Sequence, residues 1–129
     1  MRIIKYNESV VATVFDGTFE NGTKPLTEES LPLQIIALKH EKGKKLVPHT
    51  HRPTDRTTKT LSEALMVFSG LVQVTIYTHE GVLVERVELS RGQGVQIIDG
   101  GIGIEVVEDA EMMEFKNGPF VEDKIVINN

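Results

Sequence analysis

The chain of 129 residues contains no cysteine and no tryptophan, and only 5% of its residues are aromatic. Without cysteine, the protein has no disulfide bonds, thiolate nucleophiles, iron–sulfur clusters or cysteine-ligated zinc. A bound metal ion would therefore be held by histidine and carboxylate side chains. The chain has four histidines, so the number of such sites is small.

Long hydrophobic runs are also missing. The apolar runs span a few residues each, whereas a membrane-spanning helix needs roughly 20. The first residues, Met1–Glu8, lack the apolar stretch and small-residue cleavage site of a secretory signal. We therefore expect a cytoplasmic protein with no membrane partner, built as a single domain over residues 1–129.

Positive charge is scarce overall but locally concentrated. The chain has 14 basic and 19 acidic residues, a net charge of −5, which argues against nucleic acid as a partner. The stretch from Lys39 to Lys59 nevertheless holds seven basic and two acidic residues, a net +5. This stretch is either a solvated loop or a local positive field for a small anion. In the second interpretation, Arg52, Arg56 and Lys59 bind the ligand.

Short apolar segments separated by Gly, Pro, Asn and Asp predict an all-β fold of about eight strands. The expected strands cover residues 10–15, 33–40, 64–68, 72–77, 82–89, 95–98, 102–107 and 111–116. The dipeptide Ser69-Gly70 predicts a tight hairpin between the third and fourth of these strands.

Two local patterns add detail to this prediction. In the segment 72–77, Val72, Val74 and Ile76 alternate with other residues and are expected to face the core. The segment Leu26–Leu31 is the only predicted helical turn, with Thr27 as its cap, and it is expected to be short or irregular.

The strongest chemical signal is the pair His49 and His51. In an extended segment the two side chains lie on the same face, where they form a two-ligand clamp for a metal ion. Glu63 would complete a set of two histidines and one carboxylate, which suits Fe, Mn, Zn or Ni. In the alternative interpretation the histidines contact an organic ligand directly, and Glu63 forms a salt bridge with Arg56 or Lys59.

A longer pattern contains the histidine pair. Gly43 is followed after five residues by His49-Thr50-His51, and Glu63 is followed after six residues by Gly70. This pattern resembles the first motif of the cupin superfamily. Residues 92–101 resemble its second motif. Residues 107–120 resemble the ending of small bacterial single-domain cupins, some of them encoded among polysaccharide-biosynthesis genes.

The resemblance implies a double-stranded β-helix, the cupin jelly-roll barrel, over residues 33–125 with an N-terminal strand extension over residues 1–32. The basic residues around the histidine pair add the expectation of a small, anionic, sugar- or acid-like ligand, and together with the metal set they favour a metal-dependent isomerase or epimerase. The alternatives are an iron-dependent dioxygenase, metal-free isomerisation by the histidines, and non-catalytic binding. A homodimer is expected, with Val10–Phe15 as the edge strand that pairs.

The chain departs from the cupin pattern in two places. The spacer Arg52–Ser62 has eleven residues, far more than is usual in the family, and is expected to loop out. The fourth cupin ligand is missing, because its position falls at Ile102 or Gly103, and neither side chain can bind metal. The favoured register points Ile102, Ile104 and Val106 inward; the other register points Gly103 and Glu105 inward.

Overall fold

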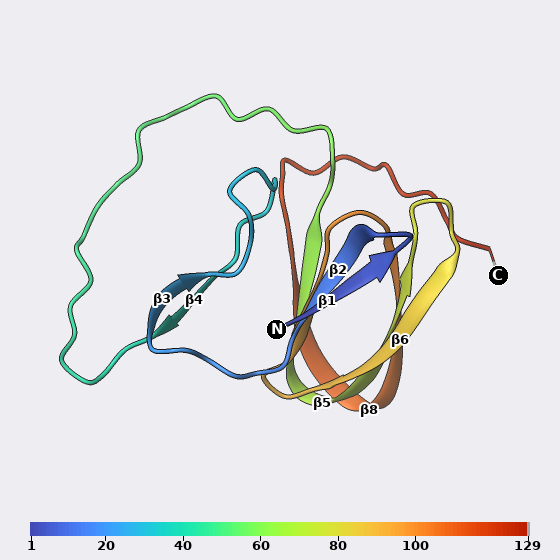
Figure 1. The fold of residues 1–129 in the computed structure, drawn as a ribbon, viewed down its shortest axis with the longest axis horizontal. Helices are drawn as coiled ribbons and strands as arrows, with labels where there is room; N and C mark the ends of the chain where they lie inside the picture. The colour runs from blue at the N-terminus through green and yellow to red at the C-terminus, as the bar shows by residue number, and fades with distance from the viewer. Residues whose placement is uncertain (129) are drawn as a thin grey trace.

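The computed structural model describes residues 1–128, which form eight strands and no helix (Figure 1). The strands are β1 (Arg2–Tyr6), β2 (Ser9–Phe15), β3 (Gly22–Pro25), β4 (Ile36–Lys39), β5 (Glu63–Tyr77), β6 (Leu83–Ser90), β7 (Gly94–Ile97) and β8 (Gly101–Lys116). The all-β prediction is therefore confirmed. No helix long and apolar enough to cross a membrane occurs among the described residues.

Six of the strands form one curled antiparallel sheet, a half-barrel. Its order is β1-β2-β7-β5-β6, and β8 pairs with β5. The strands at the two ends of this order are joined by a salt bridge of 2.6 Å between Arg2 Nη1 and Glu85 Oε2. The sheet thus curls until its ends approach one another. Strands β3 and β4 pair separately, as a two-stranded sheet.

The core fills the concave side of the curled sheet. Val72, Val74 and Ile76 on β5 are completely buried, with 0% of their surface exposed, so the predicted alternation is confirmed. They pack with apolar side chains from β1, β2, β6 and β7. Burying one such side chain contributes roughly 1.5–3 kcal/mol, so this strand supplies a large share of the stabilisation.

The predicted hairpin at Ser69-Gly70 is wrong, because β5 runs through both residues without ending. Gly70 has a φ of +84°, and a Cβ at this position would overlap the backbone carbonyl oxygen of Asp109 on β8. The glycine therefore bends the strand where β8 approaches closely. A tight turn and a bend in a continuous strand both favour glycine, so the residue types alone do not distinguish the two.

Two further predictions are wrong, one entirely and one in part. Strand β2 lies between β1 and β7, so Val10–Phe15 is not an edge strand. The segment Leu26–Leu31 forms irregular turns, in agreement with the expected irregular element, but no helix that Thr27 could cap. The hydroxyl of Thr27, its predicted cap, accepts a hydrogen bond from the backbone N–H of Ile35 at 3.1 Å and donates to Gln34 Oε1, also at 3.1 Å.

Strand β8 joins two of the predicted strands into one. Ile102, Ile104 and Val106 lie opposite the buried β5 residues, so their side chains share the core face and the favoured register is confirmed. Nevertheless 39% of Ile104 and 53% of Val106 remain exposed. One edge of β8 pairs with β5, and its other edge has no partner strand in the part of the chain that the structure describes.

The segment between β4 and β5 forms no strand and arcs away from the half-barrel (Figure 1). Every residue from 38 to 61 is exposed. Of the predicted strand over residues 33–40, only Ile36–Lys39 forms, as β4. The N-terminal residues, by contrast, contribute β1 and β2 to the main sheet.

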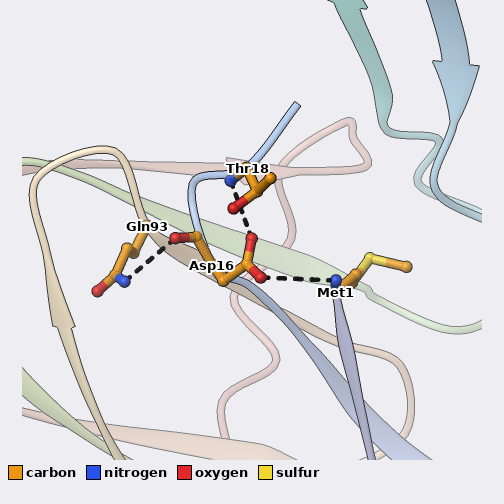
Figure 2. A network of polar contacts seen from close by, with 4 residues as sticks. All are labelled: Met1, Asp16, Thr18 and Gln93. Carbon is orange, nitrogen blue, oxygen red and sulfur yellow. Dashed lines mark hydrogen bonds and ion pairs between the residues drawn. The ribbon is translucent and has the colours of Figure 1, made fainter. Parts of the chain in front are cut away.

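A small polar network anchors the turn after β2 (Figure 2). Asp16 Oδ1 accepts a hydrogen bond of 2.9 Å from the Thr18 N–H, and Asp16 Oδ2 lies 3.9 Å from the N-terminal amine of Met1. Gln93 Nε2 donates to the Asp16 carbonyl at 3.2 Å. The backbone hydrogen bond from Thr18 lowers the pKa of Asp16. The network connects the start of β1, the end of β2 and the turn before β7.

The bend in β5 predicts a difference between two glycines. Gly43 has a similar φ, +91°, but no atom lies within 4 Å of where its Cβ would be. We expect Gly43→Ala to cost about 1 kcal/mol of unfolding free energy, the left-handed backbone penalty alone. Gly70→Ala should cost about 3 kcal/mol or more, because overlap with β8 adds to that penalty. Urea unfolding of both variants checks this, and equal costs would contradict the close approach.

Candidate functional site

The histidine pair lies in the exposed segment before β5. The ring centroids of His49 and His51 are 5.0 Å apart, and the rings are nearly perpendicular at 76°. His49 Nδ1 lies 2.8 Å from the carbonyl oxygen of Val47. When this nitrogen donates to the carbonyl, Nε2 carries the free lone pair, an arrangement typical of histidines that bind metal ions or organic ligands. The structure thus brings the two histidines together, as their spacing predicts.

Glu63 lies elsewhere, at the start of β5, where 23% of its side chain is exposed. Its cross-strand neighbour on β8 is Lys116, whose Nζ lies 3.7 Å from Glu63 Oε2. The same Nζ lies 3.4 Å from Glu114 Oε2. The salt bridge of Glu63 is therefore formed with Lys116, and not with Arg56 or Lys59 as the alternative interpretation expects.

Burial and charge act in opposite directions on this cluster of Glu63, Glu114 and Lys116. Desolvation raises the pKa of Glu63 above its ordinary value of 4.5, the positive charge of Lys116 lowers it, and the negative charge of Glu114 raises it again. The carboxylate of Glu114 raises the pKa of Lys116 above 10.5. A partly buried carboxyl group thus lies beside an ammonium group, a pair that can hold and move a proton.

The predicted three-residue metal site is not assembled in this conformation. Within residues 1–128, no three histidine or carboxylate side chains are grouped so that they could hold a metal ion. His49 and His51 fit a two-ligand clamp, while Glu63 is engaged by Lys116. A metal ion bound by the histidine pair would therefore need a third ligand other than Glu63.

The basic residues predicted to bind the ligand are all in the exposed segment. Arg52, Arg56 and Lys59 form no salt bridge with any residue that the structure describes. Among the residues that the structure describes, these three side chains form one hydrogen bond, which is local and runs from Arg56 Nη1 to the Thr54 carbonyl at 3.3 Å. Their positive charges are therefore available to an external anion.

A hollow of about 500 Å³ lies at the start of this segment, next to β3 and β4. Lys39, Lys42 and Lys44 line it together with His40 and one acidic residue, Glu41. His40 Nε2 lies 3.0 Å from Thr23 Oγ1, which fixes the ring across the two-stranded sheet. The lysines extend the positive field of the segment toward the sheet.

Sequence reasoning did not find Lys116 and Glu114 as neighbours of Glu63. The alternation of apolar and polar residues over 113–116 does place the two on one strand face. Their contact with Glu63 also depends on where β8 pairs with β5, and the pairing register shifts in three places between Val67 and Val72. The sequence carries no visible signal for those shifts.

Comparison of the chain with protein-family models, with curated proteins and with solved structures found no match. The resemblance to cupins therefore rests on the two sequence motifs. The curled antiparallel sheet is compatible with a β-barrel.

The raised pKa of Glu63 predicts a pH-dependent stability contribution. The folded state binds this proton more tightly than the unfolded state, so the contribution is fully present below pH 4.5 and is lost as pH rises through the higher folded pKa. The uncharged amide in Glu63→Gln removes this dependence. The unfolding free energy of Glu63→Gln minus that of the wild type should therefore increase above pH 4.5.

Urea unfolding between pH 4 and pH 7 measures that difference. Glu88→Gln, a substitution of an exposed carboxylate on β6, is the matched control and should not show the increase. A Glu63→Gln difference that stays constant over this range would contradict the desolvation of Glu63.

Proposed function

We propose that the protein is a cupin-type barrel that binds a small anionic ligand, of the class of sugar phosphates, nucleotide sugars or sugar acids. The observation that carries the proposal is the position of Arg52, Arg56 and Lys59, which are unpaired among the described residues and follow the histidine pair directly in the chain. Guanidinium groups bind phosphate and carboxylate in two-pronged hydrogen bonds.

Electrostatics favour an anion at this segment. The whole chain carries −5, whereas the segment from Lys39 to Lys59 carries +5. A small anion is repelled by most of the surface and attracted here, so the local field directs it to the segment. The Nε2 atoms of His49 and His51 add donors or acceptors for ligand hydroxyl groups.

Proton transfer on the ligand, as in an isomerase or epimerase, is a second candidate function. The cluster of Glu63, Glu114 and Lys116 favours it, because a partly desolvated carboxylate stands beside an ammonium group. The Glu63 carboxylate would take a proton from the carbon next to a carbonyl group and return it to a neighbouring carbon, as an isomerase does. An epimerase would need a second group to deliver the proton to the opposite face. The Lys116 ammonium would stabilise the negative charge on the carbonyl oxygen.

A divalent ion, Fe, Mn, Zn or Ni, remains part of the proposal through His49 and His51. Bound there, the ion would act as a Lewis acid on a ligand oxygen. The two histidines fit this role because they lie together and His49 Nδ1 is held by a carbonyl group. Two ligands alone hold such an ion weakly, so a third group would have to come from the ligand, from water or from another part of the protein.

Charge reversal tests the anion proposal. The triple variant Arg52→Glu/Arg56→Glu/Lys59→Glu should bind sugar phosphates at least about tenfold more weakly than the wild type, with a weaker salt dependence, because the attracting charges become repelling ones. Isothermal titration against a panel of sugar phosphates, nucleotide sugars and sugar acids measures this. Lys5→Glu/Lys24→Glu/Arg91→Glu makes the same charge change outside this trio and should bind normally. Equal affinities for the two triple variants would overturn the assignment.

Elemental analysis separates metal-dependent from metal-free binding. Untagged protein purified without chelators and reconstituted with Fe, Mn, Zn or Ni should retain metal, and His49→Ala/His51→Ala should lose most of it while keeping its circular dichroism spectrum. His40→Ala/His79→Ala removes the other two histidines and should not lower the metal content. Metal retained without His49 and His51 would place the site elsewhere, and no retention by the wild type would favour the metal-free barrel.

A further inference from the structure

We propose that the segment of residues 42–51 of one copy pairs with the free edge of β8 of a second copy, and that the second copy's segment does the same in return. The segment is called the arm below. This inference concerns assembly and holds whichever ligand the protein binds. It also assigns the histidine pair to an interface between copies.

The first support is the unfinished edge of the half-barrel. Strand β8 is 16 residues long, and within residues 1–128 it pairs with another strand along one side only. The edge of a strand without a partner strand presents backbone N–H and C=O groups that favour the addition of another strand. Core-facing Ile104 and Val106 at this edge stay exposed, so the strand lacks a neighbour that would cover them.

The second support is the state of the arm. Its side chains are exposed throughout, including 79% of Val47. The hydrogen bonds recorded within it are local, such as those of Lys44 and His49. An extended arm of ten residues spans about 33 Å, and β8 is longer than that, so the edge can accommodate the whole arm. Pro48 lacks an N–H, which an edge strand tolerates on its outer side.

Charge complementarity identifies the occupant. On β8, Glu105, Glu108 and Asp109 are exposed and form no salt bridge within residues 1–128. The arm carries three lysines and no acidic residue, Lys42, Lys44 and Lys45. Two β8 edges would repel each other, because each carries these three carboxylates. The arm is thus the part of a second copy whose charge matches β8.

The direction of the arm favours exchange between copies over closure on its own sheet. In Figure 1 the segment between β4 and β5 curves around the far side of β3 and β4 and away from β8. A reciprocal exchange around a twofold axis satisfies both edges at once. It also brings His49 and His51 of each copy onto the other copy's sheet, where carboxylates of β8 become available to them.

Two opposite charge reversals test the pairing. The arm variant is Lys42→Glu/Lys44→Glu/Lys45→Glu, and the edge variant is Glu105→Lys/Glu108→Lys/Asp109→Lys. Each variant alone places like charges opposite one another, so its dimer dissociation constant should increase at least about tenfold over the wild type. In an equimolar mixture, the acidic arm meets the basic edge and the basic arm meets the acidic edge. The mixture should therefore form a one-to-one heterodimer.

Size-exclusion chromatography with light scattering measures the masses, and native mass spectrometry identifies the heterodimer. Lys5→Glu/Lys24→Glu/Arg91→Glu, which has the same net charge as the arm variant, should dimerise like the wild type. Circular dichroism excludes unfolding as the reason for a monomer. A wild type that is monomeric up to millimolar concentration, variants that dimerise normally, or a mixture that stays monomeric would each overturn the proposal. Anion binding by Arg52, Arg56 and Lys59 is measured separately, so failure of the assembly does not imply failure of the proposed function.

Discussion

The bend of β5 at Gly70 organises the main sheet. Before the bend β5 pairs with β7, and after it β5 pairs with β6, while β8 follows along the opposite side through both halves. Strand β5 thus pairs with three other strands, and the curl of the sheet begins at the bend of β5. The absent Cβ at Gly70 is what lets the Asp109 carbonyl approach. The buried valines, the Glu63–Lys116 contact and the free edge of β8 all follow from this pairing.

Local patterns predicted part of this architecture. The alternation around Val74 determined which side chains are buried, because only one register of an alternating strand places its apolar face on the core. The hairpin at Gly70 was wrong because the deciding contact comes from Asp109, which is distant in sequence. The capping role of Thr27 was wrong because its hydroxyl accepts a hydrogen bond from the Ile35 N–H instead of capping a helix. In both cases a contact with a residue farther along the chain outweighed the local preference of the turn residues.

The candidate site was predicted in its parts but not in its arrangement. The spacing of His49 and His51 correctly implied that they lie together, because residues separated by one position on an extended segment share a face. The residue of β8 that lies beside Glu63 depends on the pairing register of β5 and β8, which shifts at three irregularities. Its partner Lys116 could therefore not be identified from the sequence. The basic segment was recognised from its composition, but composition does not tell whether its charges meet a small ligand or another protein chain.

The sequence separation between paired strands of the main sheet also has a consequence for how the chain folds. Tyr77 pairs with Leu83 across a short turn, so the β5–β6 hairpin closes a small loop at low entropic cost. Strands β7 and β8 follow directly in the chain and add to it. In contrast, Ala12 of β2 pairs with Ile97 of β7, and the exposed segment before β5 lies between them. We therefore expect residues 63–116 to form the folding nucleus and the two N-terminal strands to dock last.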